Sequence, residues 1–141
     1  MKAPKHYFYL NKYDFYKFTR CLQCENQTKV RKFCLMIHYE DKHKNIHRLL
    51  SLNKSCKYCT KCDLIIGQKS DLDALISQIT PQVGLKFSPD NYFVFGTQAR
   101  KDWKKGQEEY VDQKDALTLA HPFKDILQFE IRPAGWYFDG E

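Results

Sequence analysis

The sequence lacks an apolar run long enough to form a signal peptide behind its basic start or to cross a membrane. It also lacks a glycine-rich phosphate loop, a nucleophile elbow and a zinc-protease motif, so no common catalytic signature is present. No internal repeat or low-complexity segment occurs, and an apolar share of 43% argues against disorder. We therefore expect a soluble, cytoplasmic globular protein. An enzyme whose active site has no local motif remains an alternative.

Acidic residues are scarce in the first half of the chain. Residues 1–70 carry 15 Lys and Arg against 5 Asp and Glu, a balance of +10, whereas residues 71–141 carry 8 against 12, a balance of −4. All six cysteines lie in the basic half. Such a charge is typical of surfaces that bind nucleic-acid phosphates, although it can also serve only to keep a protein soluble. RNA is the preferred nucleic acid, because no helix rich in basic residues is apparent.

Four of the cysteines form two Cys-x-x-Cys pairs. Cys21 and Cys24 make the first pair, Cys59 and Cys62 make the second, and 34 residues separate the pairs. In a reducing compartment thiols stay free, so pairs at this spacing are better explained as metal ligands than as disulfides. Two short loops that each aim two sulfurs at one point satisfy the tetrahedral geometry of a structural Zn²⁺ ion. We therefore predict zinc as the cofactor, held by these four cysteines.

The segments Cys21-Leu22-Gln23-Cys24 and Cys59-Thr60-Lys61-Cys62 resemble the two knuckles of the zinc-ribbon class. The resemblance covers roughly residues 15–68, and it implies antiparallel strands and a structural ion but no particular activity. Zinc ribbons usually carry a glycine after each pair, where the chain adopts a left-handed conformation. Glu25 and Asp63 stand at these positions, so the resemblance implies strained or differently shaped knuckles.

Cys56 offers an alternative partner for Cys59 at the same spacing. We prefer Cys62, because the apolar segment 64–66 directly after it supplies the strand that leaves a knuckle. Cys56, Cys59 and Cys62 together resemble part of a ferredoxin cluster motif, but the next cysteine of that motif is absent. Cys34 and the unused cysteine are interpreted as small buried apolar residues.

Histidine ligands are an alternative to the four thiolates. His43 and His47 have the histidine spacing of a zinc finger with two cysteine and two histidine ligands, yet 18 residues separate Cys24 from His43 where about 12 is usual. We expect these histidines, together with His38, to lie in a solvated loop. A catalytic zinc ion would keep a coordination position open, whereas four thiolates close the site.

These patterns predict an α+β fold in which residues 1–68 form a four-cysteine zinc ribbon and residues 69–141 add a short helix and a small, mixed β-rich part. The second part can be a separate domain or continuous with the first. Expected strands lie within residues 6–20, 28–38, 49–52, 64–66, 92–95 and 127–131, with a final aromatic stretch at 136–138. Expected loops cover residues 39–48 and 100–106, and a weak helical pattern covers 108–120.

The clearest regular element is a helix over residues 71–80. Apolar residues recur at helical spacing there, Ser70 is the expected N-cap, and Pro81 ends the helix. The apolar positions are Leu72, Leu75, Ile76 and Ile79.

Basic residues on the predicted hairpin and knuckles are the candidate nucleic-acid contacts. They are Arg31, Lys32, Lys42, Lys44, Lys57 and Lys61. The aromatic residues between positions 7 and 18 can either stack on bases or form the inner face of a sheet, and we favour the core. Trp103 offers the same choice between stacking on a base and packing on the sheet. The competing hypothesis is an adaptor that docks other proteins through its basic or its acidic half.

Overall fold

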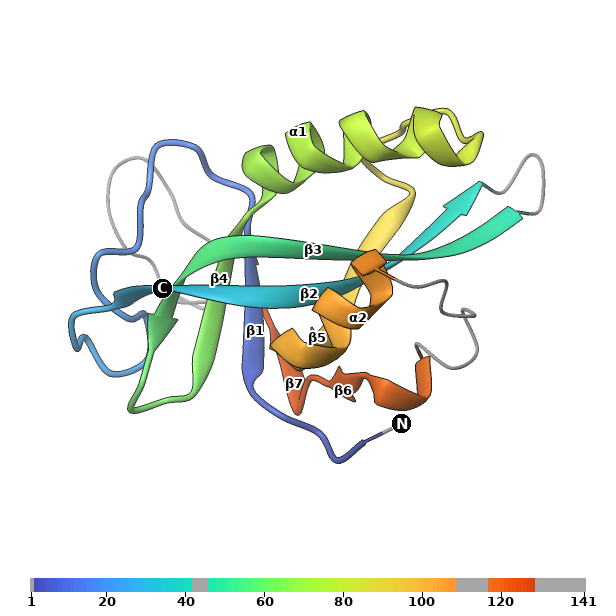
Figure 1. The fold of residues 1–141 in the computed structure, drawn as a ribbon. Helices are drawn as coiled ribbons and strands as arrows, with labels where there is room; N and C mark the ends of the chain where they lie inside the picture. The colour runs from blue at the N-terminus through green and yellow to red at the C-terminus, as the bar shows by residue number, and fades with distance from the viewer. Residues whose placement is uncertain (1, 42–45, 109–116, 129–141) are drawn as a thin grey trace.

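One mixed β-sheet organises the protein, and the computed structural model shows it as a strongly curled half-barrel (Figure 1). The structure describes residues 2–41, 46–108 and 117–128. Within them the sheet has seven strands in the order β6-β5-β2-β3-β4-β1-β7. The strands are β1 (Tyr7–Asn11), β2 (Lys29–Asp41), β3 (Ile46–Cys59), β4 (Leu64–Gln68), β5 (Tyr92–Gln98), β6 (His121–Pro122) and β7 (Asp125–Leu127).

The first strand decides the topology. β1 runs parallel to both β4 and β7 and lies between them, whereas the other neighbouring strands are antiparallel. The predicted α+β fold with a ribbon of antiparallel strands is therefore wrong. Alternating apolar residues indicate that a segment is a strand, but they do not specify which distant strand it pairs with. The sheet contains strands from both 1–68 and 69–141.

The hairpin of β2 and β3 is the longest element of the sheet. Its register pairs Lys29 with Tyr58 at one end and Asp41 with Ile46 at the other. The strand expected within residues 28–38 is confirmed as part of β2. The expected loop at residues 39–48 is wrong over its described part, since both strands continue through it. Tyr39 explains the difference: it is fully buried, and its hydroxyl donates to the carbonyl of Lys86 at 2.7 Å.

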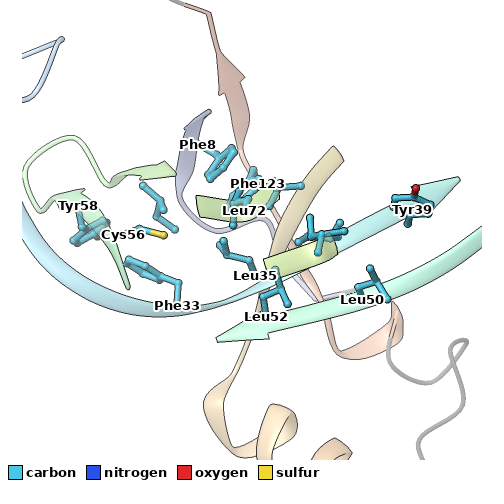
Figure 2. Packing of buried hydrophobic residues seen from close by; sticks show 14 of the residues in the cluster. Phe8, Phe33, Leu35, Tyr39, Leu50, Leu52, Cys56, Tyr58, Leu72 and Phe123 are labelled. Carbon is cyan, nitrogen blue, oxygen red and sulfur yellow. The ribbon is translucent and has the colours of Figure 1, made fainter. Parts of the chain in front are cut away.

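Helix α1 (Lys69–Ile79) covers one face of the sheet (Figure 1) and confirms the expected helix. Leu72 and Ile76 are fully buried and belong to the main hydrophobic cluster. Figure 2 shows Leu72 among the apolar side chains of the strands. Ser70 is not the cap, because the helix starts one residue earlier and its N-cap, Gln68, makes no side-chain capping bond. Pro81 lies in the 3-10 turn η1 (Thr80–Val83) that follows the helix.

A second helix stands where a loop was expected. Helix α2 (Arg100–Glu108) packs against β2 on the face of the sheet away from α1 (Figure 1). Trp103 is half-buried in this helix, and its ring nitrogen is closed to solvent. Trp103 therefore packs against the protein. The sequence pattern did not predict the helix, because its residues are nearly all polar.

The remaining expectations concern the ends of the sheet. The strand expected at 92–95 is confirmed as β5, and Leu127 lies in β7. Residues 129–131 and 136–138 and most of the possible helix at 108–120 lie outside the described residues. No helix among the described residues is long and apolar enough to span a membrane.

Candidate metal centre

The first cysteine pair lies in a tight turn between β1 and β2. An isolated bridge between Arg20 and Gln27 closes the base of the turn. Inside it, the backbone N–H of Cys21 donates to the carbonyl of Asn26 at 2.8 Å, and the N–H of Glu25 donates to the carbonyl of Cys21 at 2.9 Å. These local hydrogen bonds hold the loop in one conformation, so the cysteine side chains leave it in fixed directions.

The second pair lies in the turn between β3 and β4. Cys59 is the last residue of β3, and Cys62 lies two residues before the start of β4. In each turn a backbone N–H donates to the first sulfur of the pair: Gln23, two residues on, donates to Cys21 at 3.4 Å, and Cys62, three residues on, donates to Cys59 at 3.4 Å. These amide donors fix the orientation of the first sulfur of each pair.

Both knuckles contain a non-glycine residue in the left-handed region. Glu25 has a φ of 61° and Asp63 a φ of 55°, so the strain implied by the missing glycines is present at both positions. Asp63 has compensating contacts: its carboxylate accepts a hydrogen bond from the Tyr58 hydroxyl at 2.6 Å, contacts a ring nitrogen of His6, and lies 3.6 Å from the Lys124 ammonium. The second knuckle is thereby joined to the core.

The four sulfurs converge on one point. Their Sγ atoms all lie within 4.8 Å of one another, with Cys21 and Cys62 separated by 3.9 Å and Cys24 and Cys59 by 3.5 Å. Four sulfurs at about 2.3 Å from a tetrahedral zinc ion would be about 3.8 Å apart, whereas a disulfide would need about 2.05 Å. The cysteines are free thiols in a geometry that fits one metal ion.

The thiol pKa values within the cluster shift in opposite directions. Burial raises the pKa of Cys21 and, with the neighbouring thiols, that of Cys62. The backbone N–H of Asn26 lowers the pKa of Cys24 to about 7, helped by the other three thiols. A divalent cation would bind all four sulfurs as thiolates and displace the protons that they carry.

Cys56 is excluded from the cluster. Its side chain lies in the core under α1, where burial raises the pKa of its thiol to about 12 and its sulfur donates to the carbonyl of Lys54 at 3.7 Å (Figure 2). The structure thus brings Cys62, and not Cys56, to the other three sulfurs, in agreement with the sequence-based preference. Cys34 is buried within β2, so both remaining cysteines are the small buried residues that were expected.

The aromatic residues before the first knuckle form much of the packing around the cluster. Tyr9 and Phe18 are buried against Cys21 and Cys59, with Tyr13 and Tyr16 partly buried beside them. Their role in the core is confirmed. Phe15 differs, since it is 57% exposed.

The candidate basic residues do not all share one face of the sheet. Lys32 and Lys57 pair with Ser55 and Val30 on neighbouring strand positions and lie on the same face. Arg31 lies on the other face, with its guanidinium 5.5 Å from the ring centres of Phe33 and Tyr58. The remaining candidates are Lys61, which is exposed inside the second knuckle, and Lys42 and Lys44, which lie outside the described residues.

A cleft adjoins the basic face. It has a volume of about 300 Å³ and lies between the loop that leads to the first knuckle, the strands β3 and β4, and the start of α1. Lys17 and Lys57 line it together with Ser55, Gln68 and Asp71. Sequence patterns could not predict this cleft, because it forms from segments that are distant along the chain.

The structure gathers a second set of metal-ligating side chains that sequence reasoning assigned to a loop. His38, Glu40 and His47 lie close together at the other end of the β2–β3 hairpin. The available signal was the two-residue spacing of His38 and Glu40, which places both side chains on one face of a strand. Residues 39–48 were expected to form a loop, so this spacing was not used.

Comparisons with known proteins name no family for this chain. No protein-family model, curated protein or solved structure matches it. The candidate centre is therefore defined by its own geometry: four free cysteines, close enough to bind one metal ion.

Proposed function

We propose that the protein is a nucleic-acid-binding module whose basic surface is organised by a structural zinc ion on Cys21, Cys24, Cys59 and Cys62. The convergence of the four sulfurs is the observation that carries the metal assignment. Thiolate ligands favour zinc over hard cations such as Mg²⁺ and Ca²⁺. Four of them fill the coordination sphere, so the ion serves stability rather than catalysis.

The proposed ion ties together segments that local hydrogen bonding leaves separate. The loop that carries Cys21 and Cys24 contributes no strand to the sheet, whereas Cys59 and Cys62 lie at the junction of β3 and β4. Zinc binding to a structural site contributes on the order of 10 kcal/mol, which is comparable with the stability of a whole small domain. Metal binding would therefore place Lys17, which precedes the first knuckle, beside Lys57 at the cleft.

Charge supports the nucleic-acid part of the proposal. Four lysines lie around the second knuckle, the cleft and the adjoining face of the sheet: Lys17, Lys32, Lys57 and Lys61. None of them takes part in an ion pair among the described residues. Ammonium groups outside ion pairs are available to phosphates, and Phe15 offers an exposed ring in the same loop as Lys17. A single-stranded nucleic acid is the favoured ligand, because exposed aromatic rings stack on unpaired bases.

The metal assignment is tested by elemental analysis of reduced, tag-free protein. We expect zinc to bind stoichiometrically at the cluster, Cys24→Ser to lose that ion and unfold the knuckle region, and the matched control Cys34→Ala to retain it. If Cys24→Ser keeps the same zinc content and the same NMR spectrum as the wild type, the assignment is wrong.

The nucleic-acid part is tested by titrating a mixed-sequence single-stranded RNA into zinc-loaded protein at about 50 and 200 mM salt. We expect affinity to fall steeply with salt, and the charge-reversed variant K32E/K57E to flatten the salt dependence by about 0.7 in logarithmic slope for each phosphate that is no longer neutralised. Lys86→Glu, an exposed change beyond the end of α1, is the control and should behave like the wild type. Absent binding, or association that salt leaves unchanged, would favour the adaptor instead.

A further inference from the structure

The end of the β2–β3 hairpin away from the cysteines carries a second group of metal-ligating side chains. His38 and Glu40 are two positions apart on β2, so they lie on the same face of the sheet. His47 on β3 is the direct partner of Glu40 in the strand register. Regular strand geometry therefore places two imidazoles and one carboxylate together without any loop to position them.

The three side chains are close enough to share one ion. One ligating atom from each lies within 4.8 Å of the others, and the rings of His38 and His47 have their centres 5.3 Å apart at an interplanar angle of 30°. Phe93, the register partner of His38 on β5, also packs against the His38 ring with a centre distance of 5.1 Å. Two neighbouring rings therefore hold the His38 ring in place.

One ring nitrogen of His38 has no hydrogen-bond partner among the described residues. The residue is half-buried, and this nitrogen, Nδ1, is closed to solvent. A buried polar nitrogen without a partner costs about 1–3 kcal/mol. An ion pair between Glu40 and His47 would leave this nitrogen without a partner. A metal ion bound at Nδ1 would satisfy it and would be bound by the Glu40 carboxylate at the same time.

We propose that His38, Glu40 and His47 bind a second metal ion, a borderline divalent cation of the zinc class. Imidazole suits Zn²⁺, Co²⁺, Ni²⁺ and Cu²⁺, and it disfavours Mg²⁺ and Ca²⁺, which prefer oxygen ligands. Three protein ligands leave a fourth position for water, and His47 is exposed, so that position faces solvent. The arrangement differs from the cysteine centre, where four thiolates leave no place for an exogenous ligand.

The two centres are independent of one another. His47 and Cys59 are twelve residues apart on β3, which corresponds to an extended length of roughly 40 Å. The two centres therefore share no ligand, and the second proposal stands even if the cysteine cluster holds no ion.

Zinc stoichiometry of the whole, tag-free, reduced chain tests the second site. We expect a second equivalent of Zn²⁺ to bind the wild type in the presence of excess Mg²⁺, and to shift the ring resonances of His38 and His47. His47→Ala and the nearly isosteric Glu40→Gln should each lose that equivalent while the first remains. Arg48→Ala is the matched control: Arg48 is the exposed neighbour of His47 on β3, on the opposite face, and its loss should leave the stoichiometry unchanged.

The outcomes separate the two proposals. Retention of the histidine-dependent equivalent in Cys24→Ser would support the second site whatever happens at the first. The second site is refuted if the wild type shows no zinc-dependent shift of its histidine resonances, or if His47→Ala and Glu40→Gln bind as much zinc as Arg48→Ala. Displacement of the second ion by Mg²⁺ would also refute it, because that outcome indicates a simple carboxylate contact.

Discussion

Substituting glycine at each knuckle gives opposite predictions for two residues with nearly the same backbone conformation. Glu25 and Asp63 both lie in the left-handed region, which costs an L-residue about 1–2 kcal/mol. Glycine removes this cost but loses about 0.5–1 kcal/mol through the greater freedom of the unfolded chain. Glu25 is exposed, so Glu25→Gly should stabilise the protein by about 0.5–1 kcal/mol.

Asp63→Gly gains the same backbone relief but loses the carboxylate that joins the knuckle to the core. Two hydrogen bonds disappear, from the Tyr58 hydroxyl and from His6, and a bond to a charged group is worth about 1.5–3 kcal/mol. Because the carboxylate is 31% exposed, we discount the loss and expect a net destabilisation of about 2–4 kcal/mol. Asp63→Asn keeps an oxygen acceptor and tolerates the left-handed conformation, so it should cost less.

The assay is the urea midpoint of unfolding at one fixed concentration of free zinc, because metal binding contributes to apparent stability. Glu25→Ala is the matched control: it removes the same side chain but keeps the Cβ atom, so it should gain nothing. The reasoning is refuted if Glu25→Gly and Glu25→Ala have the same midpoint, or if Asp63→Gly is as stable as the wild type.

Two further predictions test the core. Burial raises the pKa of Cys56 to about 12, so its thiolate fraction at pH 8 is roughly a thousandfold below that of a free thiol. Alkylation of folded, zinc-loaded protein should modify Cys56 correspondingly slowly and about tenfold faster per pH unit up to about pH 10; labelling as fast as in urea would contradict its burial. Tyr39→Phe should cost about 1–3 kcal/mol in thermal unfolding, because it leaves the Lys86 carbonyl and Ser88 N–H without their partner, and an unchanged melting temperature would show that water replaces it.

The local chemistry of the cysteine centre was predictable from the chain. The spacing within each pair is set by a short turn whose geometry depends on neighbouring residues alone, and the strand after Cys62 distinguished it from Cys56. The missing glycines likewise implied left-handed strain, which Glu25 and Asp63 carry. Helix α1 was also predictable, because apolar residues at helical spacing need a single buried face.

Tertiary structure alone decided which strands pair and which polar residues meet. β1 lies between β4 and β7 because both of its faces are buried: Phe8 lies in the core under α1, and Tyr9 packs against the cysteines. The pairing of β1 therefore depends on strands far along the chain. The extension of β2 and β3 is stabilised by the burial of Tyr39, and it turns an expected loop into two strands. The sequence thus determined where sulfur can bind a metal ion, since those contacts begin within a few residues. The cleft forms only when a loop, two strands and a helix from distant parts of the chain come together, and the His38 cluster forms only when the β2–β3 register is set.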